Sequence, residues 1–280
     1  MKVVLFCGGL GTRLREYSDT IPKPLVPIGH RPIIWHLMKY YASYGHTEFI
    51  LCLGYRGLLI KEYFMEYKEW ASNDFRLSGG GDQVELFSTD LDDWSITFVD
   101  TGRDTNIGQR LRAVREHLGD DEIFLANYSD GLSDLPLDDQ VASFRRSGAV
   151  ASFVSVRPSQ SFHTIRHDES GWVTAINDAQ SSGIWVNGGF FVMRPEIFDY
   201  LEGGEELVEE PFRRLTGEKR LLTFPHTGFW ACMDTFKDKK MFDDMYEAGE
   251  RPWEVWGRAG TQDAAGNPVT SASGRGNVRS

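Results

Sequence analysis

The 280-residue chain has few of the features that mark secreted or membrane-spanning proteins. No apolar run approaches the roughly 20 residues needed to cross a bilayer. The opening MKVVLFCGGL ends in glycines and lacks the longer apolar region of a signal peptide. The three cysteines are an odd number, and no two of them have the paired spacing of a zinc site. We therefore expect a cytoplasmic protein with reduced thiols and no membrane partner.

A basic surface is also lacking, because the formal net charge is -11. A nucleic-acid-binding face would need a stripe of Lys and Arg, so we expect no nucleic-acid partner. The charge is unevenly spread, however. Residues 1–70 carry nine Lys or Arg against six Asp or Glu. If the protein binds a small anion, we expect the binding site to include residues of this first quarter.

Short apolar runs alternate with helical patterns along the first half of the chain. Val3–Cys7 is apolar and ends in glycines, as a buried strand entering a turn does. Ile33–Tyr44 has apolar side chains at helical spacing after Pro32, a residue suited to a helix start. The same patterns predict strands at Glu48–Leu53, Trp94–Val99 and Ile123–Ala126 and helices at Leu58–Trp70 and Leu111–Leu118. This rhythm predicts an α/β fold with a parallel sheet flanked by helices.

The second half is richer in strand patterns, which predict an added β-rich lobe. Its strand candidates are Ala149–Val156, Phe162–Arg166, Val173–Ile176 and Phe190–Met193. The last segment, 257–280, is rich in Gly, Ser, Ala and Thr and has few large apolar residues to anchor it. We expect a disordered tail there and one domain over residues 1–256.

A glycine-rich loop, Gly8-Gly9-Leu10-Gly11-Thr12-Arg13-Leu14, follows the first predicted strand. Glycines at this place let backbone N–H groups approach a polyphosphate closely. The loop matches neither a Walker A motif nor a dinucleotide fingerprint, so by itself it is a weak signal. Arg13 lies in the loop and Lys23 follows about ten residues later, which places two cations at one predicted strand end. The alternative is a tight turn with two solvated charges.

The segments GGLGTRL and PKPLVPIG resemble the signature of the sugar-nucleotide pyrophosphorylases. Within that superfamily the chain is most similar to the glucose-1-phosphate cytidylyltransferases. The narrower resemblance rests on Trp35–Met38, Gly54–Gly57, Ile60–Phe64, Val99–Gly102, Asn187–Phe191, Gly228–Trp230, Met233–Thr235 and Pro252–Trp253. It spans about residues 1–256. The resemblance implies a Rossmann-like, mixed but mainly parallel sheet, with the β-rich lobe binding the acceptor.

The resemblance also implies a catalytic set. Arg13 and Lys23 would be the catalytic cations, with Arg13 near the β- and γ-phosphates and Lys23 near the α-phosphate. Asp130 and Asp234 would be the ligands of Mg²⁺, which prefers oxygen and often takes one or two carboxylates. Two alternatives stay open: Asp130-Gly131 is a common turn pair, and Asp234 could cap the helix that starts near Phe236.

The nucleotide site implied by the resemblance has two parts. The glycine loop supplies Gly8, Gly9, Gly11 and Thr12, and a later stretch supplies Thr101, Gly108 and Arg110. Because the cytidylyltransferases keep these landmarks, CTP is the favoured nucleoside triphosphate. UTP, dTTP or GTP would need only a few changed hydrogen bonds.

The acceptor site departs from the family pattern. Where the family carries a Glu-Lys-Pro motif whose lysine binds the sugar phosphate, Asp178 stands in this chain, and His163 stands at an upstream family turn. Asn187 is retained and can hold a hydroxyl. A carboxylate facing a dianionic phosphate is unfavourable unless another cation compensates. Candidate cations for a remodelled pocket are Arg157, Arg166, His163 and His167.

Three functional classes follow from this mixed pattern. The first is a cytidylyltransferase acting on a sugar 1-phosphate, or on another phosphorylated or phosphonate acceptor. The second is the same chemistry with another nucleoside triphosphate. The third is a non-catalytic relative that binds nucleotide, although such a protein has no chemical need for the whole catalytic set. The resemblance also implies a homo-oligomer.

Overall fold

A computed structural model describes the chain except for residues 10–19, 159–162, 179–182 and 258–280. Among the described residues, no helix combines the length and the apolar character that a membrane span requires. The expected tail falls almost wholly outside the described residues. Its first residue, Gly257, closes a short 3-10 helix, η7 (Val255–Gly257).

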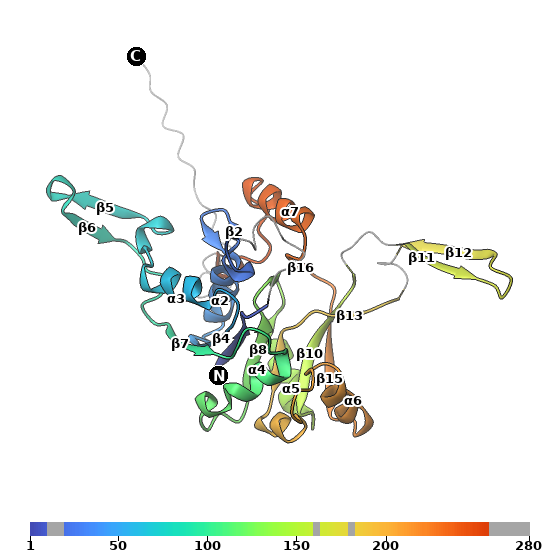
Figure 1. Ribbon diagram of the computed structural model, residues 1–280. Helices are drawn as coiled ribbons and strands as arrows, with labels where there is room; N and C mark the ends of the chain where they lie inside the picture. Colours follow the sequence, from blue (N-terminus) through green and yellow to red (C-terminus); the bar gives the residue numbers. More distant parts are fainter. Residues whose placement is uncertain (10–19, 159–162, 179–182, 258–280) are drawn as a thin grey trace, which may run out of the picture.

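An eight-stranded sheet forms the centre of the molecule (Figure 1). Its strands are β1 (Val3–Phe6), β4 (Glu48–Leu53), β7 (Ser95–Asp100), β8 (Phe124–Tyr128), β10 (Ala151–Val156), β13 (Val186–Asn187), β14 (Phe191–Met193) and β15 (Leu221–His226). The order is β13-β10-β14-β8-β1-β4-β7, and β15 also pairs with β10. The β1–β4, β1–β8, β4–β7 and β10–β15 pairs are parallel, whereas β13 and β14 run antiparallel to their neighbours. The expected mixed, mainly parallel sheet is confirmed.

Both faces of this sheet are buried, which explains why its central strands are continuous apolar runs. Successive side chains of a strand point to opposite faces. In β1, Val3 and Leu5 accordingly enter one hydrophobic core, while Val4 and Phe6 enter a second core on the other face. All four side chains are buried.

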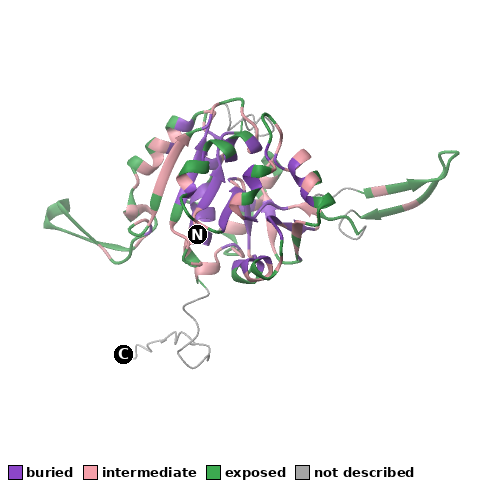
Figure 2. Cartoon of the chain, turned by 90° about the horizontal axis from the view of Figure 1, so that it is seen from below, coloured by how far each residue is buried: buried purple, intermediate pink, exposed green. Residues whose placement is uncertain are grey.

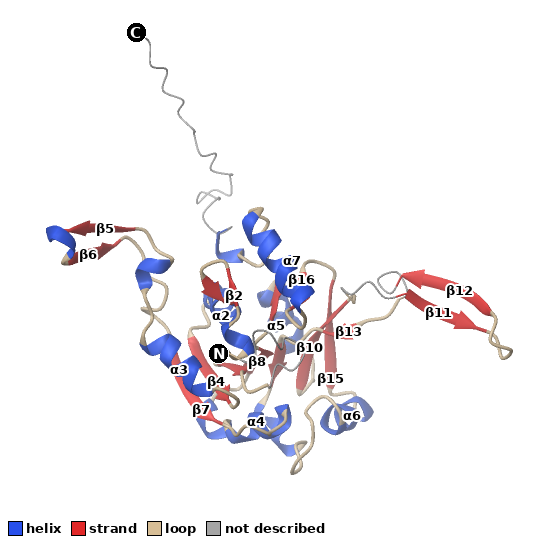
Figure 3. Cartoon of the chain, turned by 45° about the horizontal axis from the view of Figure 1, so that its top comes forward, coloured by secondary structure: helices blue, strands red, loops and turns tan. Residues whose placement is uncertain are grey.

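Helices cover each face (Figure 3). Their bounds are α2 (Ile33–Ser43), α3 (Gly57–Met65), α4 (Ile107–Ala113), α5 (Leu137–Arg146), α6 (Glu210–Gly217) and α7 (Phe236–Glu247). Buried side chains of α2, α3, α5 and α7 belong to the first core. Those of α4, α6 and the 3-10 helix η6 (Pro195–Asp199) belong to the second. The expected helical layers on both faces are therefore present.

Four small antiparallel pairs complete the described part of the fold. They are β2 (Pro27–Ile28) with β3 (Arg31–Pro32), β5 (Phe75–Ser78) with β6 (Gln83–Leu86), β9 (Gly131–Ser133) with β16 (Trp230–Cys232), and β11 (His163–His167) with β12 (Val173–Asp178). The β5–β6 and β11–β12 hairpins extend from opposite sides of the body as two arms, which are almost entirely exposed (Figure 2).

Some predicted elements differ from the observed ones. The predicted helix Leu58–Trp70 ends at Met65, because the chain then turns so that Tyr67 accepts a hydrogen bond from the indole of Trp35 at 2.7 Å. Helix α4 begins four residues before the predicted Leu111, at a capping box in which Asn106 and Gln109 bond reciprocally. Of the expected β-rich lobe, only β11–β12 is separate, since β10 and β14 join the central sheet.

Candidate active site

Several of the predicted site residues lie at the carboxyl ends of β1 and β8. These strands are parallel neighbours, with Phe6 opposite Tyr128, and β4 lies on the other side of β1. The chain therefore continues from β1 to β4 on one side of β1, and it later adds β8 on the other side. In open α/β sheets a ligand crevice forms at such a switch point. Gly8 follows β1 and Asp130 follows β8, so both lie at this edge.

Lys23 lies between the two predicted metal ligands. Its Nζ is 2.6 Å from Oδ2 of Asp130 and 2.6 Å from Oδ1 of Asp234. The short β9–β16 ladder brings the two aspartates together, because Asp130 directly precedes β9 and Asp234 is the second residue after β16. The backbone N–H of Met233 also donates to the carbonyl of Asp130 at 2.8 Å. Three residues from distant parts of the chain thus form one charged cluster.

The electrostatics of this cluster favour the charged states. Burial by itself would lower the pKa of Lys23, but the combined attraction of Asp130 and Asp234 outweighs it and raises that pKa above its ordinary value. Lys23 therefore remains an ammonium ion at neutral pH. Two carboxylates on a single cation form an oxygen-rich centre of the kind that a divalent cation also fits.

The capping alternative for Asp234 is not what the structure contains. The N-cap of α7 is Thr235, whose hydroxyl accepts from the backbone of Asp238 in a capping box. The Asp238 carboxylate accepts from the backbone N–H of Thr235 at 2.8 Å and from that of Asp234 at 3.1 Å. The Asp234 side chain instead faces Lys23. Asp130 does lie in a turn, and its carboxylate faces Lys23 as well.

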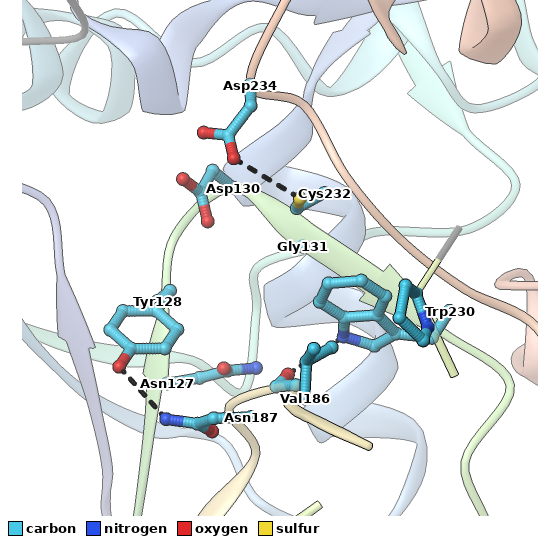
Figure 4. Close-up of a pocket in the computed structure, with 11 residues that line it drawn as sticks. Asn127, Tyr128, Asp130, Gly131, Val186, Asn187, Trp230, Cys232 and Asp234 are labelled. Carbon is cyan, nitrogen blue, oxygen red and sulfur yellow. Dashed lines mark hydrogen bonds between the residues drawn. The ribbon is translucent and has the colours of Figure 1, made fainter. Parts of the chain in front are cut away.

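A cavity of about 320 Å³ opens beside this cluster (Figure 4). Its described lining consists of Asn127, Tyr128, Asp130, Gly131, Pro158, Val186, Asn187, Gly188, Trp230, Cys232 and Asp234. The Asn187 amide donates to the Tyr128 hydroxyl at 3.4 Å, and the Trp230 indole donates to the Gly188 carbonyl at 2.8 Å. Asn187, predicted as an acceptor residue, therefore lies in the same pocket as both predicted metal ligands.

Arg110 and Thr101 lie next to Gly8, the first residue of the glycine loop. The Arg110 side chain is 2% exposed, and its guanidinium donates to the Gly8 carbonyl at 3.1 Å, the Leu53 carbonyl at 3.2 Å and the Thr101 hydroxyl at 2.8 Å. Thr101 in turn donates to the Leu53 carbonyl at 2.8 Å. These contacts join the ends of β1, β4 and β7 around one buried cation.

The described glycines of the predicted nucleotide site have different surroundings. A Cβ at Gly8 would lie 1.9 Å from the Arg110 guanidinium, so any other residue would have to displace that guanidinium or the backbone at position 8. A Cβ at Gly9 would meet nothing within 4 Å. At Gly108 it would lie 2.3 Å from the Glu205 carbonyl, so close packing of α4 explains this glycine. The predicted Gly11, Thr12 and Arg13 lie outside the described residues.

His163 and Asp178 lie on the β11–β12 arm. They are cross-strand partners at the open end of the β11–β12 arm, and both are exposed. Neither is among the described residues that line the cavity. The segment 179–182 that follows Asp178 lies outside the described residues. The structure thus brings Asn187 to the site and sets the other two predicted acceptor residues on the arm.

Several lining residues were not predicted as site residues. Tyr128 comes two positions before Asp130, and Trp230 and Cys232 come four and two positions before Asp234. The Cys232 thiol donates to Asp234 at 3.5 Å. Burial, together with the neighbouring Asp234 carboxylate, raises the pKa of this thiol to about 12. Two signals were available for these residues: their proximity in sequence to the two aspartates and, for Trp230, the family segment Gly228–Trp230.

Comparison with known proteins gives a consistent picture. A family model described as nucleotidyl transferase matches residues 2–238. A probable glucose-1-phosphate cytidylyltransferase of Bacillus subtilis is 39% identical over 91% of this chain and 100% of that protein. A glucose-1-phosphate cytidylyltransferase of Salmonella typhi is 37% identical with the same coverage.

A similar fold occurs among solved structures. The crystal structure of a putative glucose-1-phosphate thymidylyltransferase from Bacillus anthracis superposes with a TM-score of 0.64. The match covers 88% of this chain and 94% of that one at 16% identity. At 16% identity, this similarity shows a shared fold and nothing about activity.

Proposed function

We propose, from the premise that the chain belongs to the nucleotidyl transferase family, that it transfers CMP from CTP to a sugar 1-phosphate and releases pyrophosphate. The chain is a sugar-1-phosphate nucleotidyltransferase similar to the glucose-1-phosphate cytidylyltransferases. One observation carries the site assignment. Lys23, Asp130 and Asp234 converge within 2.6 Å contacts at the switch point of the sheet, beside a pocket that also contains Asn187.

The reaction needs no general base. A phosphate monoester has a second pKa of about 6, so the acceptor is mostly a dianion at neutral pH. One of its oxygens forms a bond to the α-phosphorus of CTP, and the bond from that phosphorus to the oxygen bridging the β-phosphate breaks. Pyrophosphate leaves with the electron pair. The protein's tasks are to align two anions and to neutralise the charge that develops on the leaving group.

Residues of this chain suit those tasks. Lys23, an ammonium at the carboxyl ends of the strands, faces the α-phosphate in our proposal. Arg13 faces the β- and γ-phosphates. The loop that starts at Gly8 and Gly9 offers backbone N–H groups to the same polyphosphate. The buried Arg110 holds the first residue of this loop through its hydrogen bond to the Gly8 carbonyl.

The site also fits Mg²⁺, and Asp130 and Asp234 would hold it. The described residues contain no cluster of three or more His, Cys, Asp or Glu side chains able to hold a metal. Mg²⁺ often takes only one or two carboxylates, with phosphate oxygens completing its coordination. When bound, the ion supplies positive charge to the triphosphate.

Two further proposals concern the extent and assembly of the protein. We propose that residues 1–256 form one nucleotidyltransferase domain and that the protein assembles as a homo-oligomer. Exposed apolar side chains on both arms, such as Leu77 at 58% and Trp172 at 76%, support assembly. Sedimentation velocity tests this, and a single monomeric species at micromolar protein concentration would contradict it.

Pyrophosphate release tests the proposed function. Wild-type protein is assayed with Mg²⁺, each of the four nucleoside triphosphates, and glucose, mannose or galactose 1-phosphate. We expect the highest turnover for CTP with one of these acceptors. Lys23→Met should lose most of this activity, whereas Lys240→Met, which removes an exposed lysine paired with Asp244, should retain it. Absence of pyrophosphate release with every pair would refute the proposal.

A further inference from the structure

In the proposed reaction the acceptor brings a phosphate dianion into a pocket whose described lining residues include no cation. None of the described lining residues is Lys, Arg or His. Lys23 lies beside the pocket, but its Nζ already faces two carboxylates at 2.6 Å. Asp130 and Asp234 themselves line the cavity. An acceptor dianion therefore needs a positive charge from a residue next to the lining.

Arg157 is adjacent to this lining. It follows β10 directly and precedes Pro158, which lines the cavity. In the β10–β13 pair, Ser155 lies opposite Asn187 and Val156 opposite Val186. Because side chains alternate along a strand, Arg157 continues the face that carries Ser155 and Asn187. The side chain thus starts from the same face as the pocket residue Asn187.

The contacts of Arg157 hold it against the segment that enters the pocket. Its guanidinium carbon lies 4.1 Å from the ring centroid of Trp185, and Nη1 donates to the Ile184 carbonyl at 3.2 Å. These two residues directly precede the pocket residues Val186 and Asn187, which Figure 4 shows at the cavity. Stacking on an aromatic ring fixes the plane of a guanidinium and leaves its edge open to a ligand.

The guanidinium also retains binding capacity. Among the contacts of the described residues, Arg157 donates one hydrogen bond, to the Ile184 backbone carbonyl, and forms no ion pair with a carboxylate. A guanidinium has five N–H donors in a fork that matches phosphate oxygens in a bidentate manner. Arg157 is only half-exposed, which reduces screening of its charge by water.

The other cations considered from the sequence are placed differently. Arg166, His163 and His167 all lie on the β11–β12 arm, which extends away from the body (Figure 1), and all three are exposed. We propose that Arg157 binds the phosphate, or equally a phosphonate dianion, of the acceptor. This assignment rests on the proposed function. It names Arg157 as the residue whose positive charge lets the pocket near Asn187 accept the phosphate dianion of the acceptor.

Steady-state kinetics with CTP, Mg²⁺ and glucose 1-phosphate test this assignment. The variants are Arg157→Gln and Arg157→Lys, and Arg166→Gln is the matched control. Losing a charge-assisted phosphate contact should raise KM for glucose 1-phosphate roughly 10- to 100-fold in Arg157→Gln. KM for CTP should change by less than about twofold, since Arg157 contacts the segment before Asn187 and not the Lys23 cluster. Arg157→Lys should recover part of the loss, and Arg166→Gln should behave as wild type.

Three results would overturn the assignment: an unchanged KM for glucose 1-phosphate in Arg157→Gln, an equal rise in both KM values, or an equal effect of Arg166→Gln. Calorimetric titration of glucose 1-phosphate into wild type and Arg157→Lys gives an answer without turnover. Weaker binding to the variant supports the assignment, whereas equal binding or no binding to wild type overturns it. Wild type that binds glucose 1-phosphate but releases no pyrophosphate with any triphosphate would instead refute the proposed function.

Discussion

Gly8→Ala tests whether the buried guanidinium of Arg110 positions the loop that starts the nucleotide site. An added Cβ would lie 1.9, 2.2 and 2.6 Å from three atoms of that guanidinium. Arg110 cannot move away freely, because it donates to the carbonyls of Gly8, Leu53 and Arg103 and to the Thr101 hydroxyl. Either the loop is displaced or these hydrogen bonds break.

The size of the effect follows from these contacts. Overpacking of a filled site costs about 1–3 kcal/mol. Each hydrogen bond lost from a charged group adds about 1.5–3 kcal/mol. We therefore expect Gly8→Ala to lower the free energy of unfolding by about 2–4 kcal/mol and to raise KM for CTP. Gly9→Ala is the matched control for stability, because its Cβ would meet none of the described residues within 4 Å. It should cost less than about 0.5 kcal/mol.

A double-mutant cycle with Arg110→Ala isolates the clash. Urea unfolding gives the free energy of unfolding of wild type, both single variants and the double variant. Once the guanidinium is gone, alanine at position 8 has room, so its cost should fall by about 1–3 kcal/mol. If Gly8→Ala costs the same with and without Arg110, or no more than Gly9→Ala does, the role given to Arg110 is wrong.

Three further changes test other parts of the account. Asp234→Asn should weaken Mg²⁺ activation by roughly 10- to 100-fold or more in a metal titration of pyrophosphate release, and an unaltered titration would remove Asp234 from the metal site. Burial lowers the pKa of His36 from 6.5 to about 4, so the unfolded state binds a proton first as the pH falls. The free energy of unfolding should then fall by about 3 kcal/mol between pH 6.5 and 4 because of His36. When urea unfolding is repeated at a series of pH values, His36→Gln should lack this part of the decrease, and an unchanged pH dependence would contradict the assigned pKa. Asp90→Ala leaves the ammonium of Lys39, 2.9 Å away, without its buried carboxylate and should cost about 3 kcal/mol at pH 7, whereas the exposed Asp93→Asn should cost under about 0.5 kcal/mol; similar costs for the two would be contrary to this reasoning.

Local patterns were enough to predict several strands of the central sheet. The run Val3–Cys7 and the segment Glu48–Leu53 became β1 and β4 because buried parallel strands need continuous apolar sequence. The contact of Lys23 with Asp130 and Asp234 joins residues 107 and 211 positions apart. No local pattern encodes such separations, and only the resemblance to a known family connected these residues in advance.

Elements that depend on long-range pairing could not be predicted in this way. Strands β9 and β16 are three residues each, too short for a periodic signal, yet their ladder brings the two aspartates together. Burial of Arg110 was equally hidden, because an arginine in a polar stretch normally lies at the surface. The same holds for Arg157, whose position beside the pocket depends on its pairing with the segment before Asn187.

Phosphorus NMR of the complete reaction tests the central claim most directly. Wild-type protein is incubated with CTP, glucose 1-phosphate and Mg²⁺, and the phosphorus signals are followed over time. The account predicts loss of the CTP and sugar 1-phosphate signals, with matching growth of free pyrophosphate and of a coupled pair from a new diphosphate linkage between CMP and the sugar phosphate. Hydrolysis of CTP without that linkage, with glucose 1-phosphate or with any other sugar 1-phosphate tested, would contradict it.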